Sequence, residues 1–136
     1  MIDKATSVLL VEDNDDDAFL LCRSLDRLAP GELTVTTAGL VALATAELNR
    51  RSFDVCVLDL SLPDSVDFDG FDRIREIDPD LSIVTLSGNE DRRVAQRAAD
   101  RGAWASFVKG QVSNEELLET IRAAASASRN GLRQAC

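Results

Sequence analysis

The chain has 136 residues, 45% of them hydrophobic and 29% charged, and its 15 basic and 24 acidic side chains give a net charge of -9. This length suits one globular domain with an ordinary core, while the negative charge repels phosphate backbones and disfavours binding to nucleic acid. Histidine is absent, which excludes Ser-His triads and His-bound metals, and three scattered cysteines without a C-x-x-C pair indicate neither a disulfide framework nor a zinc site.

The opening residues, MIDKA, contain no long apolar segment ahead of a cleavage site, and no later apolar run is long enough to cross a bilayer. We therefore expect a cytoplasmic protein without membrane insertion. From residue 7 on, short apolar runs rich in β-branched residues alternate with longer segments of helical period. This pattern indicates an α/β fold whose parallel sheet is covered on both faces. The predicted strands are 7–12, 33–37, 54–58, 81–86 and 105–108.

The segments between the predicted strands carry apolar residues at helical spacing. Two clear apolar faces lie within 18–28 and 40–48, a short helix is predicted at about 69–77, and the next helix has a face of small residues within 94–99. The cysteines at positions 22 and 56 fit these segments as small buried hydrophobic residues.

The last helix begins at a capping box, Ser113–Glu116, which precedes a further apolar face. We expect the chain from Ser126 onward to fray. The predicted organisation is therefore one domain over 1–128 followed by a flexible tail over 129–136, because no repeat, low-complexity tract or linker interrupts the pattern.

Polar residues stand at the predicted carboxyl ends of separate strands. They are Glu12 and Asp13 after the first strand, Asp59 after the third, Ser87 after the fourth and Lys109 after the fifth. In an open parallel sheet, ligands gather beyond these ends, at the point where the strand order reverses. We therefore expect residues that are far apart in the sequence to form one site.

Carboxylates gathered at one edge repel one another strongly unless a cation lies among them. A magnesium ion suits such a site, because it prefers oxygen ligands and keeps several waters. We expect Asp13 and Asp59 to be direct ligands and Glu12 to act through a water. The backbone carbonyl of Ser61 would complete the set.

Asp59 is the predicted nucleophile, because a carboxylate can attack phosphorus and form an aspartyl-phosphate. The Lys109 ammonium and the Ser87 hydroxyl would each hold one phosphoryl oxygen, and magnesium would neutralise another. Taken singly, these residues have ordinary explanations, namely a loop cap, a solvated lysine and a turn serine. Their joint placement at the ends of separate strands favours the phosphoryl site.

Four motifs resemble those of response-regulator receiver domains in two-component signalling. They are VLLVEDN at 8–14, VLDLSLP at 57–63, LSG at 86–88 and FVK at 107–109. The resemblance extends over most of the chain. It implies a flavodoxin-like (βα)5 fold with the strand order 2-1-3-4-5 and a single-domain regulator similar to the chemotaxis regulators.

The same resemblance implies a partner and a chemistry. A histidine kinase or a histidine phosphotransfer protein would phosphorylate Asp59, with Mg²⁺ bound by Glu12 and Asp13. Ser87 and Lys109 would then sense the phosphoryl group, and the protein-binding face would change, with a homodimer as one form of output.

The resemblance does not imply an enzyme in the ordinary sense. Catalysis would be limited to assisting phosphoryl transfer onto the protein itself and to slow self-dephosphorylation. Ser61 and Asn89 would border the path of the attacking water.

The chain departs from the family's pattern on the output side. Ser106 stands where the family commonly has a tyrosine or phenylalanine that rotates inward on activation. Phe107 lies one position later, so its side chain should point to the opposite face and fill the core. We expect Ser106 and Trp104 at the output face. The acidic stretch 63–70 is longer than usual and is either a tolerated surface insertion or a loop that tunes access to the site.

Two other functions remain open from the sequence. A receiver-like interaction module that signals without phosphorylation would explain Ser106 and the long loop, although the complete set of site residues argues against it. A flavodoxin-like cofactor binder or an aspartate phosphatase would need a hydroxyl-rich phosphate loop after the first strand or an aspartate two residues beyond the nucleophile. The chain has Glu12, Asp13 and Asn14 in the first place and Ser61 in the second.

Overall fold

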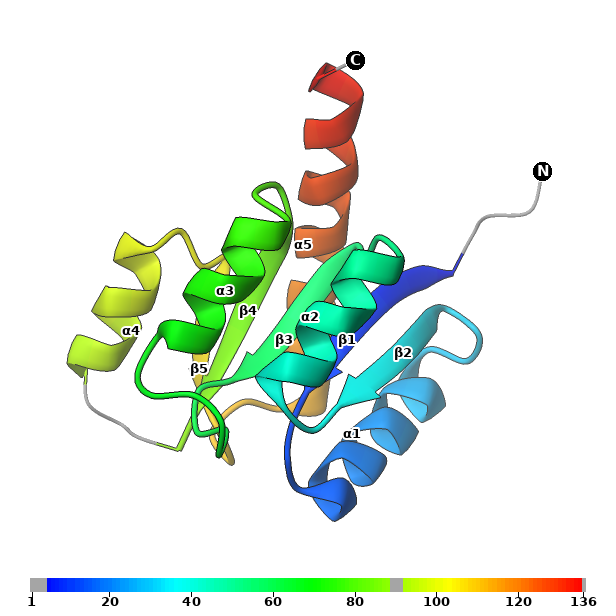
Figure 1. The fold of residues 1–136 in the computed structure, drawn as a ribbon. Helices are drawn as coiled ribbons and strands as arrows, with labels where there is room; N and C mark the ends of the chain where they lie inside the picture. The colour runs from blue at the N-terminus through cyan, green and yellow to red at the C-terminus, as the bar shows by residue number, and fades with distance from the viewer. Residues whose placement is uncertain (1–4, 89–91, 136) are drawn as a thin grey trace.

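The structure is a computed structural model that describes residues 5–88 and 92–135, without the side chains of 129–135. Five parallel strands form one sheet in the order β2-β1-β3-β4-β5 (Figure 1). The α/β class and the strand order are both confirmed, and each predicted strand end lies within one residue of the observed end. The strands are β1 (Thr6–Val11), β2 (Leu33–Ala38), β3 (Val55–Asp59), β4 (Ser82–Ser87) and β5 (Ala105–Val108).

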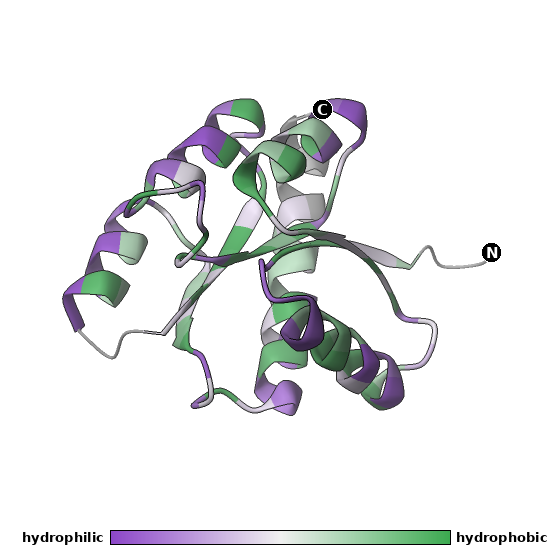
Figure 2. Ribbon diagram, turned by 60° about the horizontal axis from the view of Figure 1, so that its bottom comes forward, coloured by the Kyte–Doolittle hydropathy of each residue, from purple (hydrophilic) through white to green (hydrophobic). Residues whose placement is uncertain are grey.

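Helices cover both faces of the sheet, as Figure 2 shows with the molecule turned about the horizontal axis. One face carries α1 (Asp15–Leu28) and α5 (Asn114–Ala135). The other face carries α2 (Val41–Arg50), α3 (Asp69–Ile77) and α4 (Arg92–Asp100). The sheet is therefore the middle of three layers.

Side chains of β1 alternate between two hydrophobic cores. Val8 and Leu10 belong to the core beneath α1 and α5, whereas Leu9 and Val11 belong to the core beneath the other three helices. Both sets are buried, which is why the central strands are continuous apolar runs in the sequence. Each such side chain contributes about 1.5–3 kcal/mol to folding.

Both described cysteines contribute to these cores. Cys56 of β3 is fully buried, and burial raises the pKa of its thiol to about 12. Cys22 is half-buried and packs against the core on the α1 side. Both therefore behave as the small hydrophobic residues predicted.

The helix starts are satisfied locally at α1 and α5. Asn14 caps α1, because its side-chain oxygen accepts a hydrogen bond from the Asp17 amide at 2.9 Å, and the acidic first turn complements the helix dipole. The Ser113 hydroxyl accepts a hydrogen bond from the Glu116 amide at 3.0 Å, as the predicted capping box requires.

The described backbone is helical beyond Ser126, where the sequence predicts fraying. The helix α5 continues to Ala135 and projects beyond the sheet in Figure 1. Six of the ten residues in 126–135 are Ala, Arg, Leu or Gln, which are good helix formers. Within this stretch, Ser128 is buried, and its hydroxyl lies 2.8 Å from that of Ser82 and accepts the Ser82 amide at 3.1 Å. The domain boundary at residue 128 stays a prediction.

Candidate phosphoryl-acceptor site

The predicted site residues meet at the carboxyl edge of the sheet. Asp59 is the last residue of β3 and Ser87 the last of β4, while Glu12 and Asp13 follow β1 and Lys109 follows β5. The Lys109 amide donates to the Ser87 carbonyl at 2.8 Å, so the ladder continues one residue beyond β5. The parallel register thus brings together Glu12 and Lys109, which are 97 positions apart.

Three carboxylates form a compact cluster of oxygens at this edge. Glu12, Asp13 and Asp59 each offer one oxygen, and these oxygens lie within 4.8 Å of one another. Glu12 and Asp59 are only 6% and 2% exposed, whereas Asp13 is exposed. An all-oxygen donor set with one exposed member fits Mg²⁺, which prefers oxygen ligands and retains waters. The residues therefore fit the ion that the sequence predicts.

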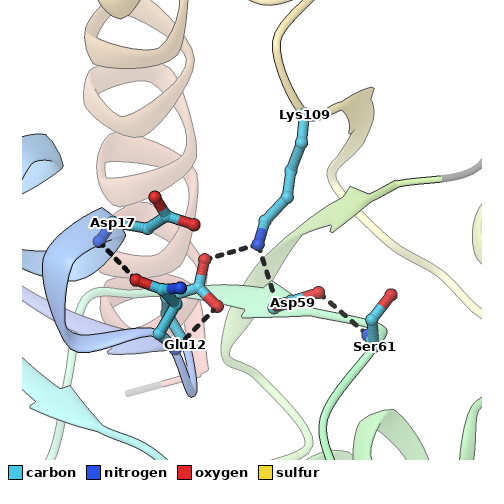
Figure 3. A network of polar contacts seen from close by, with 6 residues as sticks. Glu12, Asp17, Asp59, Ser61 and Lys109 are labelled. Atoms are coloured by element: carbon cyan, nitrogen blue, oxygen red, sulfur yellow. Dashed lines mark hydrogen bonds and ion pairs between the residues drawn. The ribbon is translucent and has the colours of Figure 1, made fainter.

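The Lys109 side chain bridges the two buried carboxylates (Figure 3). Its Nζ lies 2.5 Å from Glu12 Oε1 and 3.0 Å from Asp59 Oδ2. Buried charges are costly unless they are paired, so this ammonium compensates part of the negative charge that the fold concentrates here. The sequence predicts a lysine that meets a phosphoryl oxygen, and the structure adds that Lys109 contacts Asp59, the predicted acceptor, directly.

Burial and neighbouring charges shift the proton affinities in this network. Burial raises the pKa of Glu12 to about 7, Asp59 adds to the rise, and Lys109 opposes it. Burial alone would lower the pKa of Lys109, but its hydrogen bonds to Glu12 and Asp59 outweigh burial and raise it. The network therefore favours the protonated form of Glu12 and the charged form of Lys109.

The segment after β3 turns back onto the acceptor. The Ser61 amide donates to Asp59 Oδ1 at 2.8 Å, and the Leu60 amide donates to the Leu86 carbonyl at 2.9 Å. The sequence predicts that the Ser61 carbonyl joins the metal site and that Ser61 borders the path of water, but it does not predict this amide contact. A carboxylate that accepts the amide two residues ahead is a common turn motif of aspartate, and that pattern is the signal that could have found this contact.

Comparison with known proteins decides the family. A family model described as the response regulator receiver domain matches residues 8–122. The chain belongs to the response-regulator receiver family. Aspartate phosphorylation with Mg²⁺ is a general property of this family, and its members are generally signalling modules rather than enzymes.

Individual relatives agree with this assignment. The receiver is 30% identical to the response regulator protein TodT of Pseudomonas putida over 124 residues, which cover 91% of this chain and 53% of TodT. The receiver thus spans about half the length of this curated relative.

Solved structures share the fold. A CheY-like receiver from Methanospirillum hungatei has a TM-score of 0.81 at 18% identity, covering 93% of this chain and 98% of that one. A response regulator from Burkholderia pseudomallei, with a phosphorylated aspartic acid, a calcium ion and citrate, has a TM-score of 0.74 at 23% identity, covering 93% and 72%.

The receiver has a hydroxyl pair at Ser106, where the family commonly has an aromatic residue. Ser106 of β5 is paired in register with Thr85 of β4, and the Thr85 hydroxyl donates to the Ser106 hydroxyl at 2.8 Å. Thr85 is 1% exposed, so this bond satisfies a buried polar group. Ser87, two residues further along β4, is also buried.

Phe107 and Trp104, the other residues considered for the output side, lie in and just before β5. Phe107 packs, partly buried, against the core beneath α1 and α5, which confirms that it faces away from Ser106. Trp104 is 46% exposed ahead of β5. Asn89 lies outside the described residues, so its predicted place beside the site has no structural counterpart.

A cleft of about 350 Å³ opens beside the acceptor, between α1 and the start of α5. Glu12 and Lys109 line it together with apolar side chains that include Leu20 and Leu117. Leu20 and the neighbouring Phe19 are 60% and 58% exposed.

In the described part of the chain, none of the helices combines the length and apolar sequence needed to cross a membrane.

Proposed function

We propose that this receiver accepts a phosphoryl group on Asp59 from a histidine kinase or a histidine phosphotransfer protein, with Mg²⁺ bound beside it. The added charge then changes the surface that the receiver offers to a partner protein. The observation that carries this proposal is the Asp59 carboxylate, which is buried at the centre of the carboxyl edge with one oxygen on the Ser61 amide and the other on Lys109.

The transfer exchanges one bond to phosphorus for another. The phosphorus–nitrogen bond of the donor phosphohistidine breaks as a bond forms between phosphorus and an Asp59 oxygen. The leaving imidazole keeps the electron pair and takes up a proton. These 136 residues contain no histidine, so the phosphoryl donor lies outside them.

Residues around Asp59 stabilise the charge that reaches the site with the phosphoryl group. Lys109 exchanges its contact with the carboxylates for a phosphoryl oxygen, and the Ser87 hydroxyl binds a second oxygen. Glu12, Asp13, Asp59 and the Ser61 carbonyl would hold Mg²⁺, which would supply positive charge to the phosphoryl oxygens. In the later hydrolysis, Ser61 borders the path of the attacking water.

The cleft beside Lys109 supplies the approach for the donor protein. Its apolar wall, with Phe19 and Leu20 exposed on α1 nearby, offers hydrophobic surface next to the buried acceptor. Exposed apolar side chains beside a polar site are typical of protein interaction surfaces. A helical phosphodonor domain would bury them while presenting its histidine to Asp59.

A second candidate is an interaction module that keeps the receiver fold and signals without phosphorylation. The observations that favour it are the Lys109 bridge, which already satisfies the buried carboxylates, and the hydroxyl pair of Thr85 and Ser106 in place of an aromatic rotor. This candidate predicts a binding surface that is indifferent to phosphodonors.

The deciding experiment incubates the protein with Mg²⁺ and acetyl phosphate and follows its intact mass. The wild type is expected to gain one phosphoryl group, and Asp59→Asn is expected to gain none. Asp67→Asn, which removes an exposed carboxylate outside the acidic cluster, serves as the charge-matched control and should behave as the wild type. An unchanged wild-type mass under these conditions favours the interaction module.

A further inference from the structure

The helix α2 is capped by a side chain from a distant segment. Its N-cap residue, Leu40, makes no side-chain capping bond. Instead, Asp64 accepts the Val41 amide at 2.9 Å through one carboxylate oxygen and the Ala42 amide at 3.1 Å through the other. The first amides of a helix lack partners within the helix and carry partial positive charge, so a bidentate carboxylate satisfies both needs.

The charge state of Asp64 agrees with this role. Partial desolvation would raise the pKa of Asp64, but the amides of Val41 and Ala42 outweigh it and lower the pKa. Asp64 therefore stays ionised on the helix terminus.

The far end of the loop 63–70 is anchored against α2. The Ser65 hydroxyl accepts the Gly70 amide at 2.9 Å. A Cβ at Gly70 would lie 2.7 Å from Val41 Cγ2, so only glycine permits this close approach of α3 to α2. Between these anchors, Asp67 adopts a positive φ of 53°.

A buried aromatic ring anchors the same loop against α4. Phe68 is 3% exposed and meets Phe71 edge to face. The Arg97 and Arg101 guanidinium groups lie over the Phe68 ring, 5.1 and 4.9 Å from its centroid. The stretch 63–70 is therefore packed structure, although Asp64, Val66 and Asp67 are exposed.

The short segment 60–63 is held at both ends by these contacts. At its start, the amides of Leu60 and Ser61 bind the Leu86 carbonyl and the Asp59 carboxylate. At its end, Asp64 binds α2. The Ser61 carbonyl, which we assign to the metal site, lies between the two anchors.

The turn that precedes α2 contacts Glu12 and Asp13, on the other side of the acidic cluster from Ser61. The Glu12 amide donates to the carbonyl of Ala38, the last residue of β2, at 3.0 Å, and a Cβ at Gly39, in the turn that leads into α2, would be in ordinary van der Waals contact with the Asp13 Cα at 4.0 Å. Asp64 thus joins the segment after the acceptor to the turn that packs on Glu12 and Asp13.

We propose that Asp64 is a positioning residue for the acidic site: by binding the first amides of α2, it sets the positions of the Ser61 carbonyl and of Asp13 for a divalent cation. The inference rests on the proposed function, because it concerns the same site. It assigns to the long acidic loop a role in tuning that site.

The test compares Asp64→Ala and Asp64→Asn with Asp67→Asn, which removes the same charge from the same loop and suits a positive φ. In the metal-free proteins, amide hydrogen exchange at Val41 and Ala42 should be faster in Asp64→Ala than in the wild type. Mg²⁺ titration followed by amide chemical shifts should give Asp64→Ala a dissociation constant on the order of 10-fold higher than that of the wild type. This is the lower end of the effects seen for groups that orient metal ligands. Asp64→Asn keeps one acceptor oxygen and should fall between the two.

Phosphorylation kinetics separate positioning from a general loss of structure. If Asp64 acts on cation binding, saturating Mg²⁺ restores the phosphorylation rate of Asp64→Asn to that of the wild type. If Asp64→Ala or Asp64→Asn exposes the α2 amides but binds Mg²⁺ as the wild type does, Asp64 is only a helix cap. That result overturns this inference and leaves the proposed function standing. A wild type that binds no Mg²⁺ and gains no phosphoryl group overturns the proposed function, and the inference with it.

Discussion

The acceptor edge (Glu12, Asp59 and Lys109) and the β5 surface (Ser106 and Trp104) are built on opposite principles. At the acceptor edge, buried charges are paired over distances of 2.5 and 3.0 Å. At the β5 surface, the internal contact is a neutral hydroxyl pair and the only large side chain is an exposed tryptophan. The contrast teaches that a receiver can pair buried charges at the carboxyl edge of its sheet while a serine stands where the family commonly has an aromatic residue.

The largest expected effect concerns Phe68, which links the loop after the acceptor to α4. Phe68→Ala should lower the free energy of unfolding by about 3–4 kcal/mol, because it removes a buried ring and leaves a cavity. Urea denaturation measures the change. Val66→Ala in the same loop is the control, since Val66 is 77% exposed and should change the stability by less than about 0.5 kcal/mol. Equal effects of the two substitutions would contradict the packing described for this loop.

The next effect is a pH dependence of folding stability that arises from Glu12 at the acceptor edge. The Glu12 pKa is about 7 in the folded metal-free protein against an ordinary value of 4.5, so the folded state binds this proton more tightly than the unfolded state. The Glu12 contribution to stability is therefore fully present below pH 4.5 and is lost as the pH rises through about 7. Thermal unfolding of metal-free wild type and Glu12→Gln across this range measures it. Glu12→Gln should lack this component of the pH dependence, and parallel profiles would refute the assignment.

Removing the cation at the acceptor edge should have a smaller effect. Lys109→Met leaves two buried carboxylates without their ammonium, and we expect a loss of about 2 kcal/mol, less than for a fully buried pair because Lys109 is partly exposed. Mg²⁺ should recover part of this loss. Arg50→Met, which breaks an exposed ion pair with Glu47, should change the stability by less than about 1 kcal/mol. A Lys109→Met protein as stable as the wild type without Mg²⁺ would contradict the bridge.

The smallest effect is expected at the β5 surface. Ser106→Ala leaves the buried Thr85 hydroxyl without its partner and should cost about 1 kcal/mol. The double change of Thr85→Val with Ser106→Ala removes both hydroxyls and should restore most of the stability. Denaturant unfolding of the four proteins in this cycle checks the prediction, and independent, additive effects would show that the two hydroxyls do not interact.

The sequence predicts the sheet and the acceptor edge well, for a physical reason. Strands buried on both faces are continuous apolar runs, and residues that follow them meet at one edge because the strands are parallel. Glu12, Asp59 and Lys109 could therefore be placed together without coordinates. The opposite orientation of Ser106 and Phe107 follows from the alternation of side chains along a strand.

Contacts between segments without periodicity could not be predicted in the same way. The cap that Asp64 places on α2 joins residues 22 and 23 positions apart, and the sequence signals only that Leu40 cannot cap its own helix. Burial of Phe68 under Arg97 of α4 and under Arg101, which follows α4, likewise depends on the path of a loop. The buried contact of Ser128 in α5 with Ser82 joins residues 46 positions apart and is likewise not visible in the sequence.

The most direct test of the central claim is to map the phosphoryl group along the chain. The protein is incubated with Mg²⁺ and acetyl phosphate, digested under acidic conditions and sequenced by tandem mass spectrometry. The account predicts one acyl phosphate, on Asp59, although Asp13 is the more exposed carboxylate of the cluster. Phosphorylation of Asp13 or of another carboxylate, with Asp59 unmodified, would contradict it.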